Sequence, residues 1–425
     1  MKTGWMGAAS ALLLAGVSVP ALADSVVIHA DAVVTDADAP VRGRSTVVVT
    51  DGRIVSISDG FVDGPAGARM VHLAGKTLVA GLVDLHTHLT GDPGGDFWKE
   101  AVEPDEWGVV LGAKNARLTA LAGFTTVREA GSAPQTAFAL RRATAEGLVA
   151  GPRIVAAGPA LSIVGGHGDV SGFRPEINDI LSSGFTCTGP VECAEKVRLA
   201  SRSGSDIIKI TATGGVLSQQ GRGLEGHFSA AEMTAIVDTA HSLGLKVMAH
   251  AHGARGIEAA ARAGVDTIEH GTYIDEAAAR VMRERGTVLV PTLMAFQGIS
   301  ERLDKGIYTP TVETKVRAVA EKARVFMGQA LKWGVPIAFG TDAGVFDHGR
   351  NAQEFRLMRA QGMSDRQALA SATTGAAKAL GMEREIGRIA PGYSADIIAV
   401  SGDPTKDVTV LEKVEWVMVR GRVIQ

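Results

Sequence analysis

The stretch GLVDLHTHLT, residues 81–90, ends an apolar run with two histidines. The apolar residues are typical of a buried strand, and His86 and His88 follow at its carboxyl end. Because residues i and i+2 of a strand point to the same face, both imidazoles are expected to point in one direction. This geometry suits two nitrogen ligands for one metal ion, provided that other parts of the chain supply further ligands.

The composition of the chain is that of a globular protein with a large core. Its 425 residues are 46% hydrophobic and 21% charged, with a formal net charge of −3. Such a chain is neither disordered nor fibrous. The small net charge gives no electrostatic argument for a nucleic acid or an anionic membrane as a partner, so we expect neither.

The first residues, MKTGWMGAASALLLAGVSVPALA (1–23), have the features of a secretory signal peptide. Lys2 supplies a positive start, residues 8–19 form the apolar region, and Ala-Leu-Ala at 21–23 fits the small-x-small cleavage rule. A membrane anchor is the alternative, but the apolar stretch is short for a span of about 20 residues. We therefore expect a periplasmic or secreted mature protein.

The two cysteines, Cys187 and Cys193, lie in the segment FTCTGPVEC. In an oxidising compartment, a disulfide that closes this short loop is favoured. Free thiols are the alternative. A zinc site is disfavoured because two thiolates alone do not complete its ligand set.

Both ends of the mature chain are rich in Val, Ile and Thr. Residues 24–80 contain TDGRI, in which Asp-Gly suits a tight turn between two strands. Residues 385–425 have the same character. We predict that the two segments pair into one small β-sandwich.

Apolar strand candidates alternate with helical stretches between residues 81 and 384. The candidates are residues 78–86, 125–128, 153–157, 207–212, 245–250, 266–269, 287–291 and 336–340. One helical stretch opens with Ser229 and Glu232, which have the spacing of a capping box. Eight strands alternating with helices fit a (β/α)8 TIM barrel, which typically needs about 250 residues. A doubly wound sheet is the alternative.

Polar side chains end most of the strand candidates, where the active site of a barrel lies. These residues are His86, His88, Arg128, Glu129, His167, Lys209, His250, His252, His270 and Asp342. Any single histidine could be a hydrogen-bonded barrel residue. Several strands that place imidazoles at one level instead favour a divalent metal site.

Five segments in this order, GLVDLHTHL, IIKITATGG, VMAHAHG, TIEHG and IAFGTDAG, resemble the amidohydrolase superfamily. With the β-rich ends, the resemblance covers nearly the whole mature chain. It is strongest to the imidazolonepropionase-like and prolidase-like branch. That branch includes bacterial dipeptidases and carboxypeptidases, and relatives that hydrolyse the mycotoxin ochratoxin A.

The resemblance implies two divalent metal ions. His86 and His88 would hold the first ion with Asp342 beside it, and the second ion would be held by His250 and His270. Nitrogen and carboxylate ligands fit zinc best, with cobalt, manganese and iron as alternatives.

The resemblance also implies that Lys209 bridges the two ions as a carbamate. A carbamate supplies two oxygens and a negative charge, whereas an ammonium group would repel both cations. The modification needs a neutral amine, which burial favours. A buried lysine paired with an acid is the alternative.

In the implied mechanism, Asp342 accepts a proton from the attacking water and passes it to the leaving nitrogen. His252 and His167 would hydrogen-bond the tetrahedral oxyanion or the substrate. For His252, orientation of a metal ligand is the alternative.

A substrate with a free carboxylate needs a cation or backbone donors to hold it. Arg128, Arg222 and Arg350 are the candidates, and Arg128 could instead pair with Glu129 or a neighbouring strand.

We expect a secreted binuclear amidohydrolase that acts on dipeptides or N-acyl amino acids, with ochratoxin A as a further substrate of that class. Related proteins commonly form homo-oligomers, often octamers. A mononuclear deaminase or cyclic-amidine hydrolase is one alternative. It would need an acid near the fifth strand, where AHAHGARG has none. A non-catalytic periplasmic metal-binding protein is the other alternative.

Overall fold

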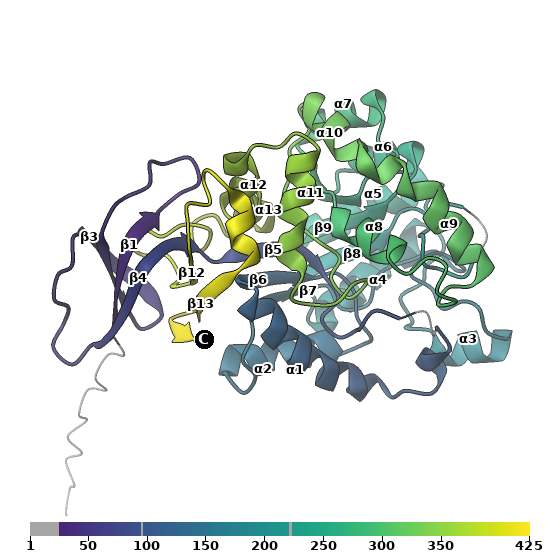
Figure 1. Ribbon diagram of the computed structural model, residues 1–425. Helices are drawn as coiled ribbons and strands as arrows, with labels where there is room; N and C mark the ends of the chain where they lie inside the picture. Colours follow the sequence, from purple (N-terminus) through teal and green to yellow (C-terminus); the bar gives the residue numbers. More distant parts are fainter. Residues whose placement is uncertain (1–24, 95–96, 221–222) are drawn as a thin grey trace, which may run out of the picture.

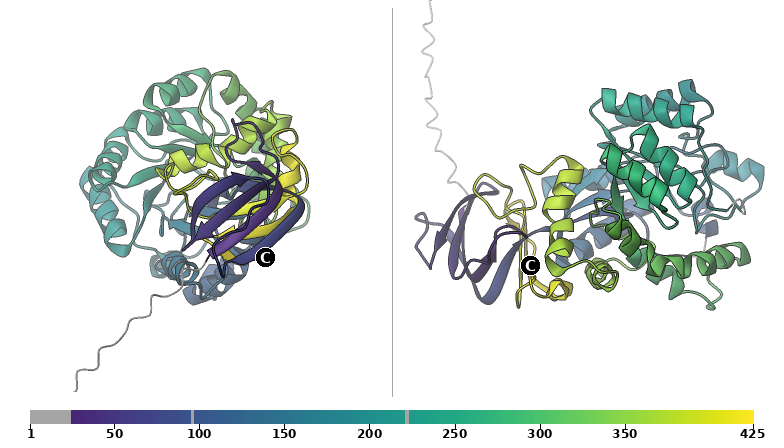
Figure 2. Two further views of the ribbon diagram at one scale, coloured as in Figure 1. Left: turned by 90° about the vertical axis from the view of Figure 1, so that its left-hand side faces the viewer. Right: turned by 90° about the horizontal axis from the view of Figure 1, so that it is seen from above.

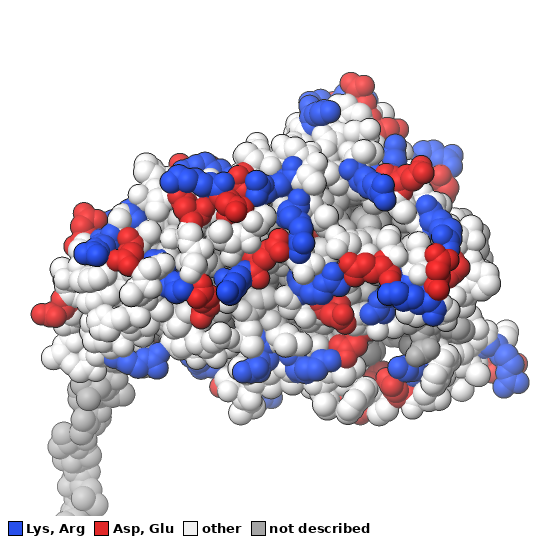
Figure 3. Space-filling model, viewed as in Figure 1, with Lys and Arg blue, Asp and Glu red and all other residues white. Residues whose placement is uncertain are grey.

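The computed structural model describes residues 25–94, 97–220 and 223–425. The predicted signal peptide, residues 1–23, and Arg222 lie outside the described residues. A β-sheet body that contains strands from both ends of the chain lies beside a larger α/β body (Figure 1). On the face shown in Figure 3, basic and acidic side chains are interspersed, as expected for a net charge of −3.

One seven-stranded sheet joins strands from the two β-rich segments (Figure 2). Its order is β14-β13-β12-β4-β1-β2-β3, and β1 pairs antiparallel with β2 but parallel with β4. The strands are β1 (Ser25–Val34), β2 (Ser45–Thr50), β3 (Arg53–Asp59), β4 (Arg69–Ala80), β12 (Ile397–Val400), β13 (Val414–Val419) and β14 (Arg422–Val423). The predicted turn between β2 and β3 is confirmed: Asp51 and Gly52 have φ of 49° and 76°, as a type I′ turn requires.

The sheet has a hydrophobic core of its own. Ile28 of β1, Leu78 of β4, Ile397 of β12 and Met418 of β13 are fully buried in one cluster. Strands from both ends of the chain therefore share one hydrophobic core, and hydrogen bonds join them into a single sheet.

Only Gly81 separates β4 from the first strand of the α/β body. A Cβ atom at this position would lie 2.1 Å from Thr125 Oγ1, so the two bodies are joined at a point where only glycine fits without rearrangement.

The α/β body contains two parallel sheets, β5-β6-β7 and β11-β10-β9-β8. The strands are β5 (Leu82–Thr87), β6 (Phe124–Glu129), β7 (Arg153–Ala156), β8 (Ile207–Thr211), β9 (Lys246–Ala251), β10 (Thr267–His270) and β11 (Val288–Val290). These strands are almost entirely buried, as expected for parallel strands covered by helices. An isolated parallel bridge joins Leu161 to Ile210, which is a residue of β8.

The prediction of a strand at residues 336–340 is wrong. Ile337 forms only an isolated parallel bridge with Leu289 of β11, and Phe339 O accepts a hydrogen bond from Leu85 N of β5. The N–H of Phe339 donates instead to Ser371 O, and Pro336 has no N–H to donate. The segment thus lies between β11 and β5 but lacks a regular ladder of hydrogen bonds.

Helices surround the strands of the α/β body (Figure 2). They are α1 (Asp105–Leu121), α2 (Thr136–Glu146), α3 (Pro175–Leu181), α4 (Pro190–Ser203), α5 (Ala230–Ser242), α6 (Ala254–Ala263), α7 (Glu276–Arg285), α8 (Leu293–Ser300), α9 (Pro310–Ala320), α10 (Phe326–Lys332), α11 (Glu354–Ala360), α12 (Asp365–Ser371) and α13 (Thr374–Leu380). The predicted capping box of Ser229 and Glu232 is present at the start of α5. Among the described residues, the helices include none with the length and apolar character of a membrane span.

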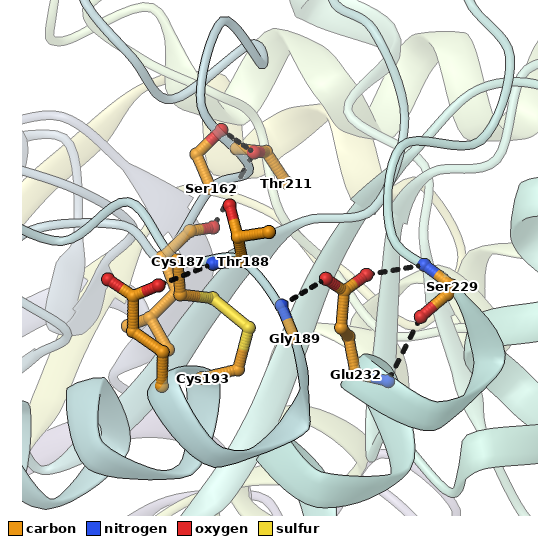
Figure 4. Close-up of a disulfide and its surroundings, with 10 residues drawn as sticks. Ser162, Cys187, Thr188, Gly189, Cys193, Thr211, Ser229 and Glu232 are labelled. Atoms are coloured by element: carbon orange, nitrogen blue, oxygen red, sulfur yellow. Dashed lines mark hydrogen bonds between the residues drawn. A yellow bond between two sulfur atoms is a disulfide. The ribbon is translucent and has the colours of Figure 1, made fainter.

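The predicted disulfide between Cys187 and Cys193 is confirmed (Figure 4). Cys187 N donates to Ser162 O at 2.9 Å, and Ser162 Oγ accepts hydrogen bonds from Thr211 Oγ1 and Gly168 N at 3.0 and 3.2 Å. The disulfide therefore ties the start of α4 to a segment that contacts the carboxyl end of β8.

We expect the double variant Cys187→Ser/Cys193→Ser to lose about 2 kcal/mol of unfolding free energy, because the crosslink restricts the unfolded chain within a short loop. Urea unfolding of the oxidised protein and the variant measures the difference. Reductant should lower the stability of the wild-type protein to that of the variant and leave the variant unchanged. Equal stability of oxidised protein and variant would contradict the expectation.

Candidate metal centre

A cavity of about 280 Å³ lies at the carboxyl ends of the parallel strands of the α/β body. All predicted metal-binding and catalytic residues line it: His86, His88, His167, Lys209, His250, His252, His270 and Asp342. Parallel strands place these side chains together because their carboxyl ends lie at the same edge of the sheet.

His86, His88 and Asp342 form one group of candidate metal ligands. The Nε2 atoms of His86 and His88 lie 3.4 and 3.3 Å from Asp342 Oδ1. His88 Nδ1 lies 2.9 Å from Gly131 O, which orients the ring so that Nε2 faces the cavity. Asp342 has a left-handed backbone, with φ of 64°, and its N–H donates to His86 O at 2.7 Å. Strained backbone of this kind is typical of functional sites.

The electrostatics of this group keep Asp342 ionised. Burial alone would raise the pKa of Asp342, but His86, His88 and Lys209 together lower it below its ordinary value. Burial lowers the pKa of His88, yet the neighbouring Asp342 carboxylate raises it above its ordinary value. The pKa of His86 is well below its usual range, chiefly because the ring is buried.

His250, His252 and His270 form the second group. The ring centroid of His250 lies 4.6 Å from those of both His252 and His270. Thr292 Oγ1 lies 2.8 Å from His270 Nδ1, and Thr272 Oγ1 lies 2.7 Å from His252 Nδ1. Burial lowers the pKa of all three rings, for His252 to about 3, so they are neutral and their nitrogens can act as ligands.

Lys209 is buried in the same cavity, with 5% of its surface exposed. Burial lowers its pKa to about 8, against the opposing effect of Glu269 and Asp342. The charge of Lys209 also contributes to the low pKa values of His86 and His250, which belong to different ligand groups. Lys209 therefore lines the same cavity as both ligand groups.

His167 lies beside the second group, with its ring centroid 4.2 Å from that of His250. A Cβ atom on Gly215 would lie 2.2 Å from the His167 ring, so glycine allows the ring to pack directly on the backbone. His167 Nδ1 is buried and has no hydrogen-bond partner among the described residues.

The donor set fits divalent metal ions. Asp342 Oδ1 is buried and accepts no hydrogen bond from any residue that the structure describes. A buried carboxylate oxygen usually has a donor, so a cation is the expected partner. The imidazole nitrogens of His86 and His88 beside this oxygen complete a donor set that zinc and similar ions prefer.

Sequence reasoning missed one part of the site, a buried chain of contacts behind His86. Glu269 Oε2 lies 2.8 Å from His86 Nδ1, and Arg128 Nη2 donates to Glu269 Oε1 at 2.7 Å. Arg128 also donates to Leu85 O and to Thr267 Oγ1 at 2.5 and 3.1 Å. The sequence did contain one indication of this contact, the acid Glu269 within the apolar segment TIEHG. A buried carboxylate almost always has an oppositely charged or hydrogen-bonding partner.

The prediction that Arg128 could bind a substrate carboxylate is therefore wrong, because its side chain is fully buried against Glu269. The alternative, a pairing with Glu129 or a neighbouring strand, holds only in part. Arg128 Nε donates to Leu85 O of the neighbouring β5, but the acidic partner of Arg128 is Glu269 of β10, in the other parallel sheet. Arg350 forms a two-pronged ion pair with Glu301 at 2.9 and 3.0 Å and does not line the cavity. Glu129 is also buried, and burial raises its pKa to about 7.

The chain belongs to the amidohydrolase family, whose model matches residues 77–424, and it is a hydrolytic enzyme. It is 29% identical to ochratoxinase of Aspergillus niger over an alignment of 417 positions, which covers 92% of this chain and 84% of the relative. The crystal structure of that ochratoxinase has a TM-score of 0.81 at 26% identity and covers 94% of this chain and 95% of its own.

Two further crystal structures are similar over nearly their whole length. A Xaa-Pro dipeptidase with bound methionine is 36% identical, with a TM-score of 0.86, and the match covers 94% of this chain and 99% of the dipeptidase. A prolidase complexed with N-methylphosphonate-L-proline is 33% identical, with a TM-score of 0.85 and the same coverage of 94% and 99%. These similarities confirm the resemblance inferred from the sequence motifs.

Proposed function

We propose that this protein is a secreted, binuclear-metal amidohydrolase that cleaves the amide bond of dipeptides or N-acyl amino acids, including ochratoxin A. The observation that carries the proposal is that two groups of candidate metal ligands, one of which includes Asp342, line one cavity together with Lys209. The similarity to a Xaa-Pro dipeptidase and to an ochratoxinase supports an amide as the substrate.

In this proposal, His86, His88 and Asp342 would hold one divalent ion, and His250 and His270 would hold the other. Lys209, as a carbamate, would supply oxygen ligands and a negative charge to both ions, and zinc is the ion that fits the donors best. When bound, the two ions supply Lewis acidity and a lowered pKa for water. Because His252 belongs to the same group as His250 and His270, binding of the second ion is the alternative to the role proposed for it below.

Asp342 is the proton carrier in the proposed reaction. Its low pKa keeps the carboxylate charged, and Oδ1 has no hydrogen-bond donor among the described residues. It can therefore accept the proton of the attacking water and deliver it to the leaving nitrogen. The leaving nitrogen departs as a neutral amine only if it receives this proton. The carboxylate is therefore needed both when water attacks and when the amine leaves.

His252 and His167 are the proposed partners of the substrate carbonyl oxygen. Both are neutral because burial lowers their pKa values, and both line the cavity. A neutral imidazole can donate one N–H to the negative charge that develops on this oxygen.

We also propose a closed (β/α)8 barrel formed by residues 81–384, with residues 24–80 and 385–425 as the β-sandwich. The isolated bridges at Leu161 and Ile337 support closure, because they lie next to the ends of the two parallel sheets. We further propose export with removal of residues 1–23 and assembly into a homo-oligomer, for which an octamer is one candidate.

Metal analysis and a substrate panel on one sample test the proposal. Protein reconstituted with zinc in bicarbonate buffer should hold two ions per chain and hydrolyse dipeptides and N-acyl amino acids. A chelator should abolish both properties, and added zinc should restore them. One ion per chain, with release of ammonia from amines or ring opening of cyclic amidines, would favour the mononuclear alternative, and bound metal without any turnover would favour a binding protein.

A further inference from the structure

Part of the cavity lining is apolar. Five side chains form it, and we call them the apolar wall: Val216, Leu217, Phe296, Ile299 and Val345. Val216 and Leu217 follow β8, Phe296 and Ile299 belong to α8, and Val345 follows the Asp342 segment. Three separate parts of the chain thus contribute to one apolar surface.

The apolar wall adjoins the proposed metal centre. The ring centroid of Phe296 lies 6.3 Å from that of His252 and 6.4 Å from that of His270, in edge-to-face arrangements. Phe326 packs behind Phe296 with its centroid 5.9 Å away, which fixes the orientation of the Phe296 ring. A group that contacts Phe296 is therefore next to an amide bond held at the second ligand group.

Lys315 of α9 holds the Val216–Leu217 part of the wall in place. Its Nζ donates to Gly215 O at 2.8 Å and to Ser218 O at 2.6 Å, on either side of these residues, and lies 3.2 Å from Gln220 O. Because these backbone carbonyls use its three donors, Lys315 fixes the wall and has none left for a substrate carboxylate.

The wall has no partner for a charged group. Among the described residues that line the cavity, Lys209 and Asp342 are the only ones with an acidic or basic side chain apart from the histidines. Both belong to the proposed metal centre. A charged substrate side chain placed against the wall would lose its hydration without gaining a partner, whereas an aliphatic or aromatic one would be removed from water favourably.

We propose that the apolar wall is the subsite for an uncharged aliphatic or aromatic group attached next to the scissile amide bond. This inference rests on the proposed function and names its substrate class. The cavity volume of about 280 Å³ suits a compact group such as the side chain of leucine, methionine or phenylalanine.

Two substrate series on the zinc-loaded enzyme test the inference. One varies the residue on the acyl side of the amide bond and the other varies the residue on the amine side, with leucine, methionine and phenylalanine compared with aspartate and lysine. At one of the two positions, substrates with an apolar residue should have kcat/KM values about 100-fold or more above those of substrates with aspartate or lysine. Equal rates for charged and apolar residues at both positions would overturn the inference.

A variant of the wall provides a second test. Leu217→Glu introduces a carboxylate at a partly exposed position of the wall, so the relative kcat/KM for the lysine substrate over the leucine substrate should rise at least about tenfold. Leu243→Glu is the matched control, because Leu243 is 46% exposed and does not line the cavity, and it should leave selectivity unchanged. Unchanged selectivity in Leu217→Glu would contradict the subsite.

Direct binding separates failure of this inference from failure of the proposed function. If no amide is cleaved, titration calorimetry with N-acetyl-L-leucinamide and N-acetyl-L-lysinamide still measures the subsite. Binding of the leucine compound alone would support the apolar subsite while overturning the proposed activity. Absence of binding, or equal binding of both compounds, would overturn the subsite.

Discussion

Replacing Asp342 by Asn should lower kcat/KM by about 10²–10⁴-fold while metal content stays close to that of the wild-type protein. The amide keeps an oxygen that can remain beside the imidazoles of His86 and His88, which lie 3.4 and 3.3 Å from Asp342 Oδ1. An amide cannot accept the proton of the attacking water, so the effect falls on turnover. Initial rates and metal analysis on the same preparation measure both quantities.

Asp347→Asn is the matched control for this variant. Asp347 lies five residues further along the same segment and is exposed, so its substitution should change neither quantity. Loss of metal together with activity in Asp342→Asn would show that Asp342 acts mainly as a ligand. Retention of full activity would remove it from the mechanism.

Loss of the buried ion pair between Arg128 and Glu269 should strongly lower the free energy of unfolding. Both side chains are fully buried, and Arg128→Met would leave the Glu269 carboxylate without its charged partner. Breaking a buried ion pair in this way costs about 3–5 kcal/mol of unfolding free energy. Urea unfolding of the metal-free proteins measures the difference without a contribution from bound ions.

Arg142→Met is the control, because Arg142 and Glu146 form an exposed pair on α2 with side chains 79% and 47% exposed. Such a pair contributes about 0.5 kcal/mol or less. An equally small loss of unfolding free energy in Arg128→Met would show that the buried ion pair does not stabilise the fold.

Glu269→Gln tests the other half of this chain of contacts. The carboxylate lies 2.8 Å from His86 Nδ1 and orients the ring, so its loss should weaken zinc binding by about 10–100-fold. Competition with a chromogenic chelator measures the affinity. Unchanged affinity would show that the ring is held by packing alone.

The location of the candidate site could be predicted from sequence because its residues follow apolar strand segments. His86, Lys209, His250, His270 and Asp342 are far apart along the chain, yet all line one cavity. Two local rules were sufficient: strand residues alternate between faces, and parallel strands bring their carboxyl ends together. The tight turn at Asp51 was predictable for a similar reason, because Asp-Gly tolerates positive φ.

Contacts between distant segments could not be predicted. Arg128 and Glu269 are 141 positions apart, and strand alternation does not say which buried cation meets which buried acid. Residues 336–340 have the composition of a strand, but the N–H of Phe339 donates to Ser371 outside the sheets. Lys315 lies on a helix where a lysine is usually solvated, and only the fold shows the carbonyls around it.

Crystallography of the zinc-loaded protein, with anomalous scattering at the zinc edge, would show whether the cavity holds a dinuclear centre. We expect two zinc ions in the cavity, one held by His86 and His88 and the other by His250 and His270, with carbamate density on Lys209 between them. A single ion, or an unmodified Lys209 that contacts neither ion, would contradict it.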